Sequence, residues 1–101
     1  MTGQQLTGRA FTVDLGAFIP RLTFVGDGRM RVEAVLGTQR VDEVVDVDVV
    51  ELAPRLVMVS WTDSSGVFVV LVQDHAAGHV HNRARLPNGD VFRAEGALSA
   101  A

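Results

Sequence analysis

The sequence contains no cysteine, lysine or tyrosine, and only three prolines and one tryptophan. Without cysteine the chain can form no disulfide, and it offers no thiolate nucleophile or thiolate metal ligand. All nine basic residues are arginine, and with the abundance of Val, Ala and Gly this suggests a bacterial protein from a high-GC genome. No apolar run approaches the roughly 20 residues of a membrane-spanning helix, and the polar N-terminus does not resemble a signal peptide. We therefore expect a cytoplasmic protein.

The charge balance is weakly acidic, with a formal net charge of −3 and a pI of about 5.4. Nucleic acids and anionic membranes are bound through basic faces, so we expect neither as a partner. The chain has 101 residues, of which 48% are hydrophobic and 21% charged. This is the composition of one globular domain. We expect that domain to span residues 1–101, with residues 1–8 as a loose N-terminal segment.

Turn-forming residues recur along the whole chain, and Val-, Leu- and Phe-rich segments lie between them. This pattern is typical of an all-β fold. Short connections favour antiparallel neighbours, and closure would remove the exposed edges of such a meander. We therefore predict a small closed antiparallel barrel of about eight strands, with a two-sheet sandwich as the alternative. The expected strands are Phe11–Leu15, Arg21–Val25, Met30–Leu36, Val41–Leu52, Leu56–Thr62, Val67–Asp74, His79–Leu86 and Val91–Leu98.

The turns of the last four strands predict which side chains face the interior. A three-residue loop at Ala76-Ala77-Gly78 would place Asp74 opposite Val80 and Val72 opposite Asn82. Side chains alternate along a strand, so this register defines one apolar face. Its members are Val57, Val59, Trp61, Phe68, Val70, Val72, Val80, Ala84, Leu86, Phe92, Ala94 and Leu98, with Asn82 as the embedded polar residue.

The opposite face would carry His79, His81, Arg83 and Arg85, with Arg83 facing Glu95 across the neighbouring strand. The same register exposes a row of apolar side chains, which favours a homodimer. The members of that row are Leu56, Met58, Val67, Val69 and Leu71. In the alternative register this mixed face is the interior, and the histidines and arginines line a cavity.

The predicted interior suggests a small-molecule site, because pockets usually combine apolar walls with a few polar groups. Asn82 would supply the polarity of this site, and Arg83 would join it in the alternative register. The walls would come from Trp61, Phe24, Phe68 and Phe92. The expected ligand is a small apolar or aromatic metabolite.

Two other functions remain open. One is an enzyme such as a cyclase, isomerase or decarboxylase, for which His81 is the best catalytic candidate. The other is a non-catalytic dimerisation module. His79 and His81, with His75 nearby, have the spacing of metal ligands on a strand. No carboxylate is expected beside them, so we predict no metal site, and we expect no cofactor.

Several short motifs stand out between Val57 and Leu98: Val59-Ser60-Trp61, Val72-Gln73-Asp74-His75, Gly78-His79-Val80, Leu86-Pro87-Asn88-Gly89 and Phe92-Arg93-Ala94-Glu95-Gly96-Ala97-Leu98. Through them this segment resembles the MoaF-like family of small calycin-type, lipocalin-like barrels. The first half of the chain matches weakly, through Leu6-Thr7-Gly8-Arg9-Ala10-Phe11 and Leu22-Thr23-Phe24. The resemblance implies a closed meander barrel, and more distant calycins imply a small apolar ligand. The chain departs from the family's usual residues at His81, where an aromatic is commoner, and at Arg83 and Arg85, where small polar residues are commoner.

Overall fold

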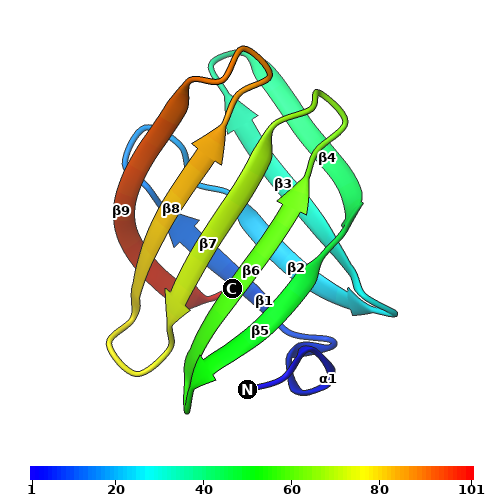
Figure 1. Cartoon of the computed structure of the whole chain (residues 1–101), viewed down its shortest axis with the longest axis vertical. Coiled ribbons are helices and arrows are strands. Elements are labelled where there is room, and N and C mark those ends of the chain that lie inside the picture. Colours follow the sequence, from blue (N-terminus) through cyan, green and yellow to red (C-terminus); the bar gives the residue numbers. More distant parts are fainter.

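The computed structural model describes residues 1–101, which form one short helix and nine strands of a single antiparallel sheet (Figure 1). No helix is long and apolar enough to cross a membrane. The elements are α1 (Gly3–Leu6), β1 (Ala10–Asp14), β2 (Arg21–Gly26), β3 (Arg29–Leu36), β4 (Gln39–Asp46), β5 (Asp48–Ala53), β6 (Leu56–Thr62), β7 (Phe68–Asp74), β8 (His79–Arg85) and β9 (Val91–Ala100).

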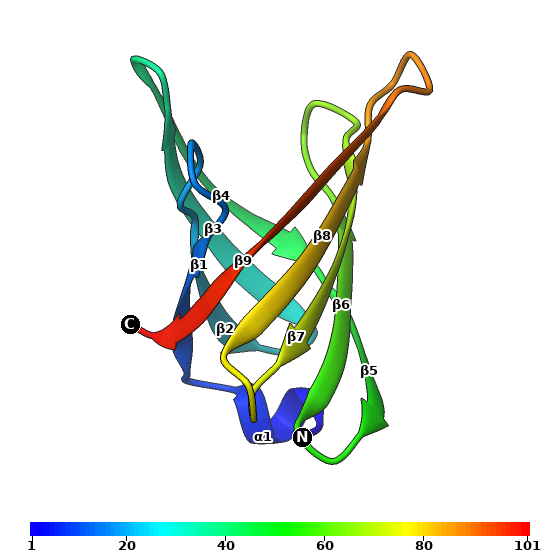
Figure 2. The same ribbon diagram turned by 90° about the vertical axis from the view of Figure 1, so that its left-hand side faces the viewer.

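The sheet is open, so the prediction of a closed barrel of about eight strands is wrong. The strand order is β4-β3-β2-β1-β9-β8-β7-β6-β5, and no ladder joins β4 to β5. The sheet curls so that β1–β4 face β6–β8, and β9 crosses between the two halves (Figure 2). The all-β class and the antiparallel meander were predicted correctly.

The break in the sheet lies at Val47, within the single strand predicted over Val41–Leu52. Val47 belongs to neither ladder, and its N–H donates to the carbonyl of Gly28 at 2.8 Å. On one side of this corner β4 pairs with β3, and on the other β5 pairs with β6. The two halves of the predicted strand thus become the two edges of the sheet. Only a long hydrogen bond, from Ser64 N–H to Glu43 Oε1 at 3.4 Å, links the segment after β6 to β4.

The N-terminal residues, expected to be a loose segment, form a capped helical turn that covers the lower end of the curled sheet (Figure 2). Thr2 and Gln5 form a capping box, in which each side chain accepts the other residue's backbone N–H. This satisfies donors that the start of a helix leaves free. Leu6 is fully buried and joins the core, which ties the turn to the sheet.

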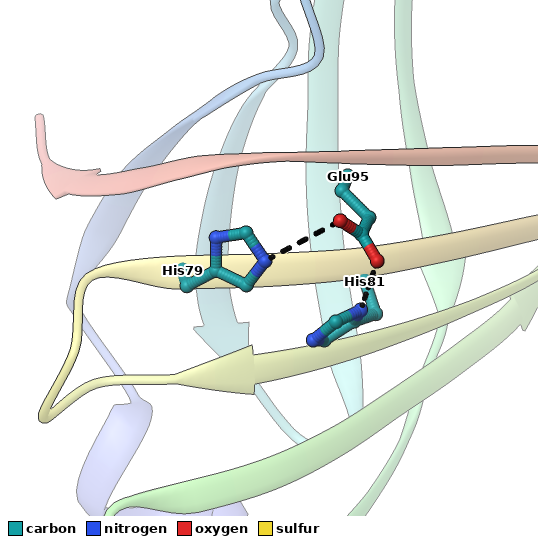
Figure 3. A group of neighbouring side chains, drawn as sticks. All are labelled: His79, His81 and Glu95. Carbon is teal, nitrogen blue, oxygen red and sulfur yellow. Dashed lines mark ion pairs between the residues drawn. The ribbon is translucent and has the colours of Figure 1, made fainter.

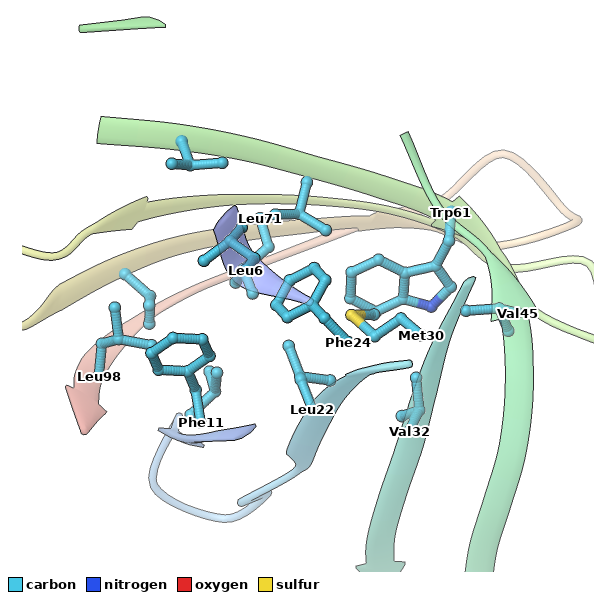
Figure 4. Packing of buried hydrophobic residues seen from close by; sticks show 14 residues of the cluster. Leu6, Phe11, Leu22, Phe24, Met30, Val32, Val45, Trp61, Leu71 and Leu98 are labelled. Atoms are coloured by element: carbon cyan, nitrogen blue, oxygen red, sulfur yellow. The ribbon is translucent and has the colours of Figure 1, made fainter. Parts of the chain in front are cut away.

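The hydrophobic core fills the space between the two halves of the sheet (Figure 4). Most strands contribute alternate residues to it, as expected for strands with one buried face. The cluster comprises Leu6, Phe11, Val13, Leu22, Phe24, Met30, Val32, Val45, Val57, Val59, Trp61, Leu71, Val80 and Leu98. Val45 faces the core while Asp46 and Asp48 are exposed, as the alternation of side chains along a strand requires.

The register of β7 differs by one residue from the prediction. Asp74 pairs with His79, so the β7–β8 loop has four residues, His75–Gly78. Asp74 Oδ1 accepts the N–H groups of Ala76 at 3.0 Å and Ala77 at 2.9 Å, which stabilises this longer loop. Gly78 closes it with a positive φ of 67°. The predicted three-residue loop is therefore wrong.

This shift exchanges the two faces of β7. Leu71 and Gln73 are buried, whereas Phe68, Val70 and Val72 lie on the outer face and were wrongly predicted to point inward. The predicted dimerisation row loses Val67, Val69 and Leu71 for the same reason, because all three line the interior cavity.

The register of β8 and β9 differs by two residues, which leaves the faces unchanged. Asn82 pairs with Ala94, and His81 rather than Arg83 pairs with Glu95. Asn82 is buried, and His81, Arg83 and Arg85 are exposed on the outer side, so the alternative register is excluded. Phe92 and Leu86 are partly exposed, at 55% and 37%, because they lie near the projecting end of this hairpin (Figure 2).

Candidate ligand cavity

An apolar cavity of about 160 Å³ lies between the two halves of the sheet, above the core. Asp63 and Asn82 are its polar residues, and the others are hydrophobic or proline. The lining residues are Val13, Leu15, Phe18, Pro20, Leu22, Val32, Trp61, Asp63, Val67, Val69, Leu71, Asn82, Ala84 and Phe92. Larger hollows occur elsewhere on the molecule, but they are more open to solvent.

Three of the residues predicted to bind a ligand meet at this cavity: Trp61, Asn82 and Phe92. Trp61 and Asn82 are only 9% and 8% exposed. Gln73 Nε2 is the one side-chain nitrogen or oxygen that is fully shielded from solvent and has no hydrogen-bond partner. The indole nitrogen of Trp61 and the amide of Asn82 also have no partner, so neither of them is fully shielded. No hydrogen bond joins Trp61 to Asn82, so the Asn82 amide can bond to a molecule in the cavity.

The other predicted site residues lie elsewhere. Phe24 is buried in the core near α1 and contacts the edge of the Phe11 ring, with the ring centroids 6.2 Å apart. Phe68 is on the outer face, where the guanidinium of Arg85 lies 5.8 Å from its ring centroid. Arg83 and His81 are also on the outer face, because residues 81 and 83 alternate with the inward Asn82. The cavity therefore contains no histidine and no arginine.

Several lining residues were missed by the sequence analysis. Leu15, Phe18 and Pro20 come from the β1–β2 connection, where Leu15 N–H donates to the carbonyl of Phe18 at 3.0 Å. Asp63 lies in the turn after β6, and its Oδ1 accepts hydrogen bonds from that turn, including the N–H of Val67 at 3.0 Å. The apolar side chains of the β1–β2 connection were the one feature of the sequence that could have indicated these additional lining residues.

The opposite end of the curled sheet carries a second polar group, centred on His75. Its Nε2 lies 3.0 Å from Oε1 of the buried Gln73, and its ring contacts Phe11 edge-on, with centroids 4.9 Å apart. Burial lowers the pKa of His75, and the nearby charges of Arg9 and Arg55 lower it further. This end is separate from the apolar cavity, since no residue lines both hollows.

Comparison with known proteins places this fold in a family. The model of the MoaF-like family matches residues 7–99 of the chain. The chain belongs to the MoaF-like family. The resemblance predicted from the sequence, including its weak first-half match, is therefore confirmed.

A solved structure shares the fold of this MoaF-like protein. It is described as a putative β-lactamase from Burkholderia vietnamiensis, with a TM-score of 0.87, 21% sequence identity and 95% of each chain covered. At this identity the likeness shows the fold alone. None of the curated proteins matches the sequence.

Proposed function

We propose that this MoaF-like protein binds a small apolar or aromatic molecule in the cavity lined by Trp61, Asn82 and Phe92. The observation that carries the proposal is an almost wholly apolar cavity whose wall includes the side-chain amide of Asn82. Small-molecule sites commonly have this construction, in which apolar walls supply affinity and a polar group fixes orientation.

The volume of the cavity limits the size of its ligand. At about 160 Å³ it is comparable with protein cavities of about 150 Å³ that hold one benzene molecule. The proposed ligand is therefore a single ring, or a larger molecule whose ring alone enters. A hydroxyl or carbonyl on that ring would pair with the Asn82 amide.

Binding is favoured over catalysis because the best acid–base candidate, His81, lies outside the cavity. Asp63 is the one titratable group in its lining, and that carboxylate already holds the turn after β6. A cyclase, isomerase or decarboxylase would require an acid or base aimed at the ligand.

The test uses two probes of similar shape, phenol and toluene, titrated calorimetrically into the whole chain. We expect both to bind, and phenol more tightly because its hydroxyl can bond to Asn82. The Asn82→Leu variant should lose this preference, by about two- to tenfold, since one hydrogen bond contributes about 0.5–1.5 kcal/mol. An unchanged preference would remove Asn82 from the site.

A cavity-filling pair completes the test. Ala84 lines the cavity, whereas Ala53 is exposed at the end of β5. Ala84→Leu should abolish binding of both probes, and the matched Ala53→Leu variant should leave it unchanged. If the intact protein binds neither probe, or if Ala84→Leu binds them normally, the proposal fails.

We also propose that the protein is a homodimer, through the outer face of β5–β7 in its corrected register. The apolar side chains there are Val50, Leu56, Met58, Val70 and Val72. They form a contiguous patch of the kind that marks protein contacts. Sedimentation velocity at micromolar concentration tests this. A native chain that sediments as a monomer, or a dimer that Met58→Glu leaves intact, would refute the proposal. We further propose that the protein is bacterial and lies in the cytoplasm.

A further inference from the structure

Two histidines and a glutamate converge on the outer face of the sheet, on the side away from the cavity (Figure 3). His79 and His81 occupy alternate positions of β8, so they share one face. Val80 and Asn82 point inward, which assigns the histidines to the outside. Glu95 joins them because β9 pairs it with His81.

The three side chains are close enough to act on one ion. His81 Nδ1 lies 3.1 Å from Glu95 Oε1, and His79 Nε2 lies 4.0 Å from Glu95 Oε2. The two imidazole rings meet edge to face, with centroids 4.7 Å apart. One ligand atom from each residue lies within 4.8 Å of the others.

We propose that His79, His81 and Glu95 form a binding site for a divalent metal ion of the zinc class. Two imidazole nitrogens and one carboxylate oxygen are a donor set that Zn²⁺ takes at about 2.0–2.2 Å. Tetrahedral coordination at those lengths needs ligand atoms about 3.3 Å apart. Small side-chain rotations of exposed residues bring the present arrangement to that spacing.

No metal site was predicted from the sequence, because no carboxylate was expected beside the histidines. That expectation depended on the register, which placed Arg83 opposite Glu95. In the structure the ladder is shifted by two residues, and Glu95 lies beside His81 instead. The shift therefore supplies the missing third ligand.

An ordinary surface ion pair between one histidine and Glu95 explains less of this geometry than a metal site does. Such a pair needs a protonated imidazole, and exposed pairs contribute little to stability. It would also need only one histidine, whereas both rings approach opposite oxygens of the same carboxylate. The side chains are 42–67% exposed, so the remaining coordination positions would be open to water.

The neighbouring row of the sheet provides a control. Arg83 and Arg93 face each other there, and neither is paired with a carboxylate within 4.0 Å. Their positive charges oppose a bound cation rather than hold it. Removing one of them should leave zinc affinity unchanged or raise it, although it alters the same outer face.

The experiment is a calorimetric titration of the whole chain with Zn²⁺, repeated with Co²⁺ to record the visible absorption of a tetrahedral site. We expect one equivalent to bind. His81→Asn and Glu95→Gln should each weaken binding at least tenfold, since even changes around metal ligands cost about 10- to 100-fold. Arg83→Gln should bind as well as the native chain or better.

His75→Gln is the matched histidine control, because His75 lies at the lower end of the molecule and takes no part in the cluster. It should retain full zinc affinity. Absence of zinc binding by the native chain, retention of affinity by both His81→Asn and Glu95→Gln, or equal loss in His75→Gln would each overturn the proposal. Circular dichroism of each variant verifies that the sheet is intact.

Discussion

Replacing Leu71 by alanine should destabilise the protein strongly, although the sequence pattern placed this residue on the surface. Leu71 is 1% exposed and belongs to the core cluster. Its neighbours on β7, Val70 and Val72, point to the outer face and are only partly buried. The three positions therefore report directly on the one-residue register of β7.

The expected magnitude follows from the atoms removed. Leu71→Ala deletes three buried carbons, which is about 2.4 kcal/mol of transfer free energy at about 0.8 kcal/mol each. A further penalty arises from the enlarged cavity, since Leu71 already borders the one of about 160 Å³. Leucine-to-alanine changes in other cores cost about 2.7–5.0 kcal/mol. We expect about 3 kcal/mol, or a decrease in Tm of about 12–24 °C for a domain of this size.

The assay is urea unfolding followed by circular dichroism and by the fluorescence of the single tryptophan, Trp61. Val70→Ala and Val72→Ala serve as controls. All three variants are made in the Met58→Glu chain, so that the proposed dimer contact of Val70 and Val72 does not contribute. Each control should cost less than about 1 kcal/mol, because its side chain loses little burial. If either control destabilises the protein more than Leu71→Ala does, the register of β7 and the assignment of its faces are wrong.

Two further predictions concern single residues elsewhere. Gly96→Ala should destabilise the protein by more than about 1 kcal/mol in urea unfolding, because an added Cβ would overlap the backbone carbonyl of Asp14. Gly3→Ala is the control and should be tolerated, since a Cβ there would make ordinary contacts. Equal effects of the two changes would contradict the close approach at Gly96. Folding lowers the pKa of His75 below its usual 6.5, so the unfolded state binds more protons than the folded state. The free energy of unfolding should therefore decrease as the pH falls from about 6.5 toward the lowered pKa. His75→Gln should reduce this slope in unfolding measured across that range, and an unchanged slope would contradict it.

Three residues of the cavity were predicted from the sequence, and the reason is independent of the register error. Trp61 and Asn82 lie on strands whose inward faces were assigned correctly, and Phe92 kept its side because a two-residue shift preserves parity. Phe68 failed because a one-residue shift on β7 reverses the face. Arg83 belonged to the alternative register, which the inward Asn82 excludes.

Alternation and turn residues by themselves predicted the all-β class and the antiparallel meander, and the motifs of the second half carried the resemblance to the MoaF-like family. These are local properties, encoded within a few residues of each strand and turn. The open edges of the sheet, the face of β7 and the meeting of Glu95 with the two histidines depended on tertiary structure. Each depends on one local feature of the structure. These features are a corner at Val47, a four-residue loop stabilised by Asp74, and a shifted ladder between β8 and β9. Alternative registers and loops fit the same local pattern, and only packing of the whole core selects among them.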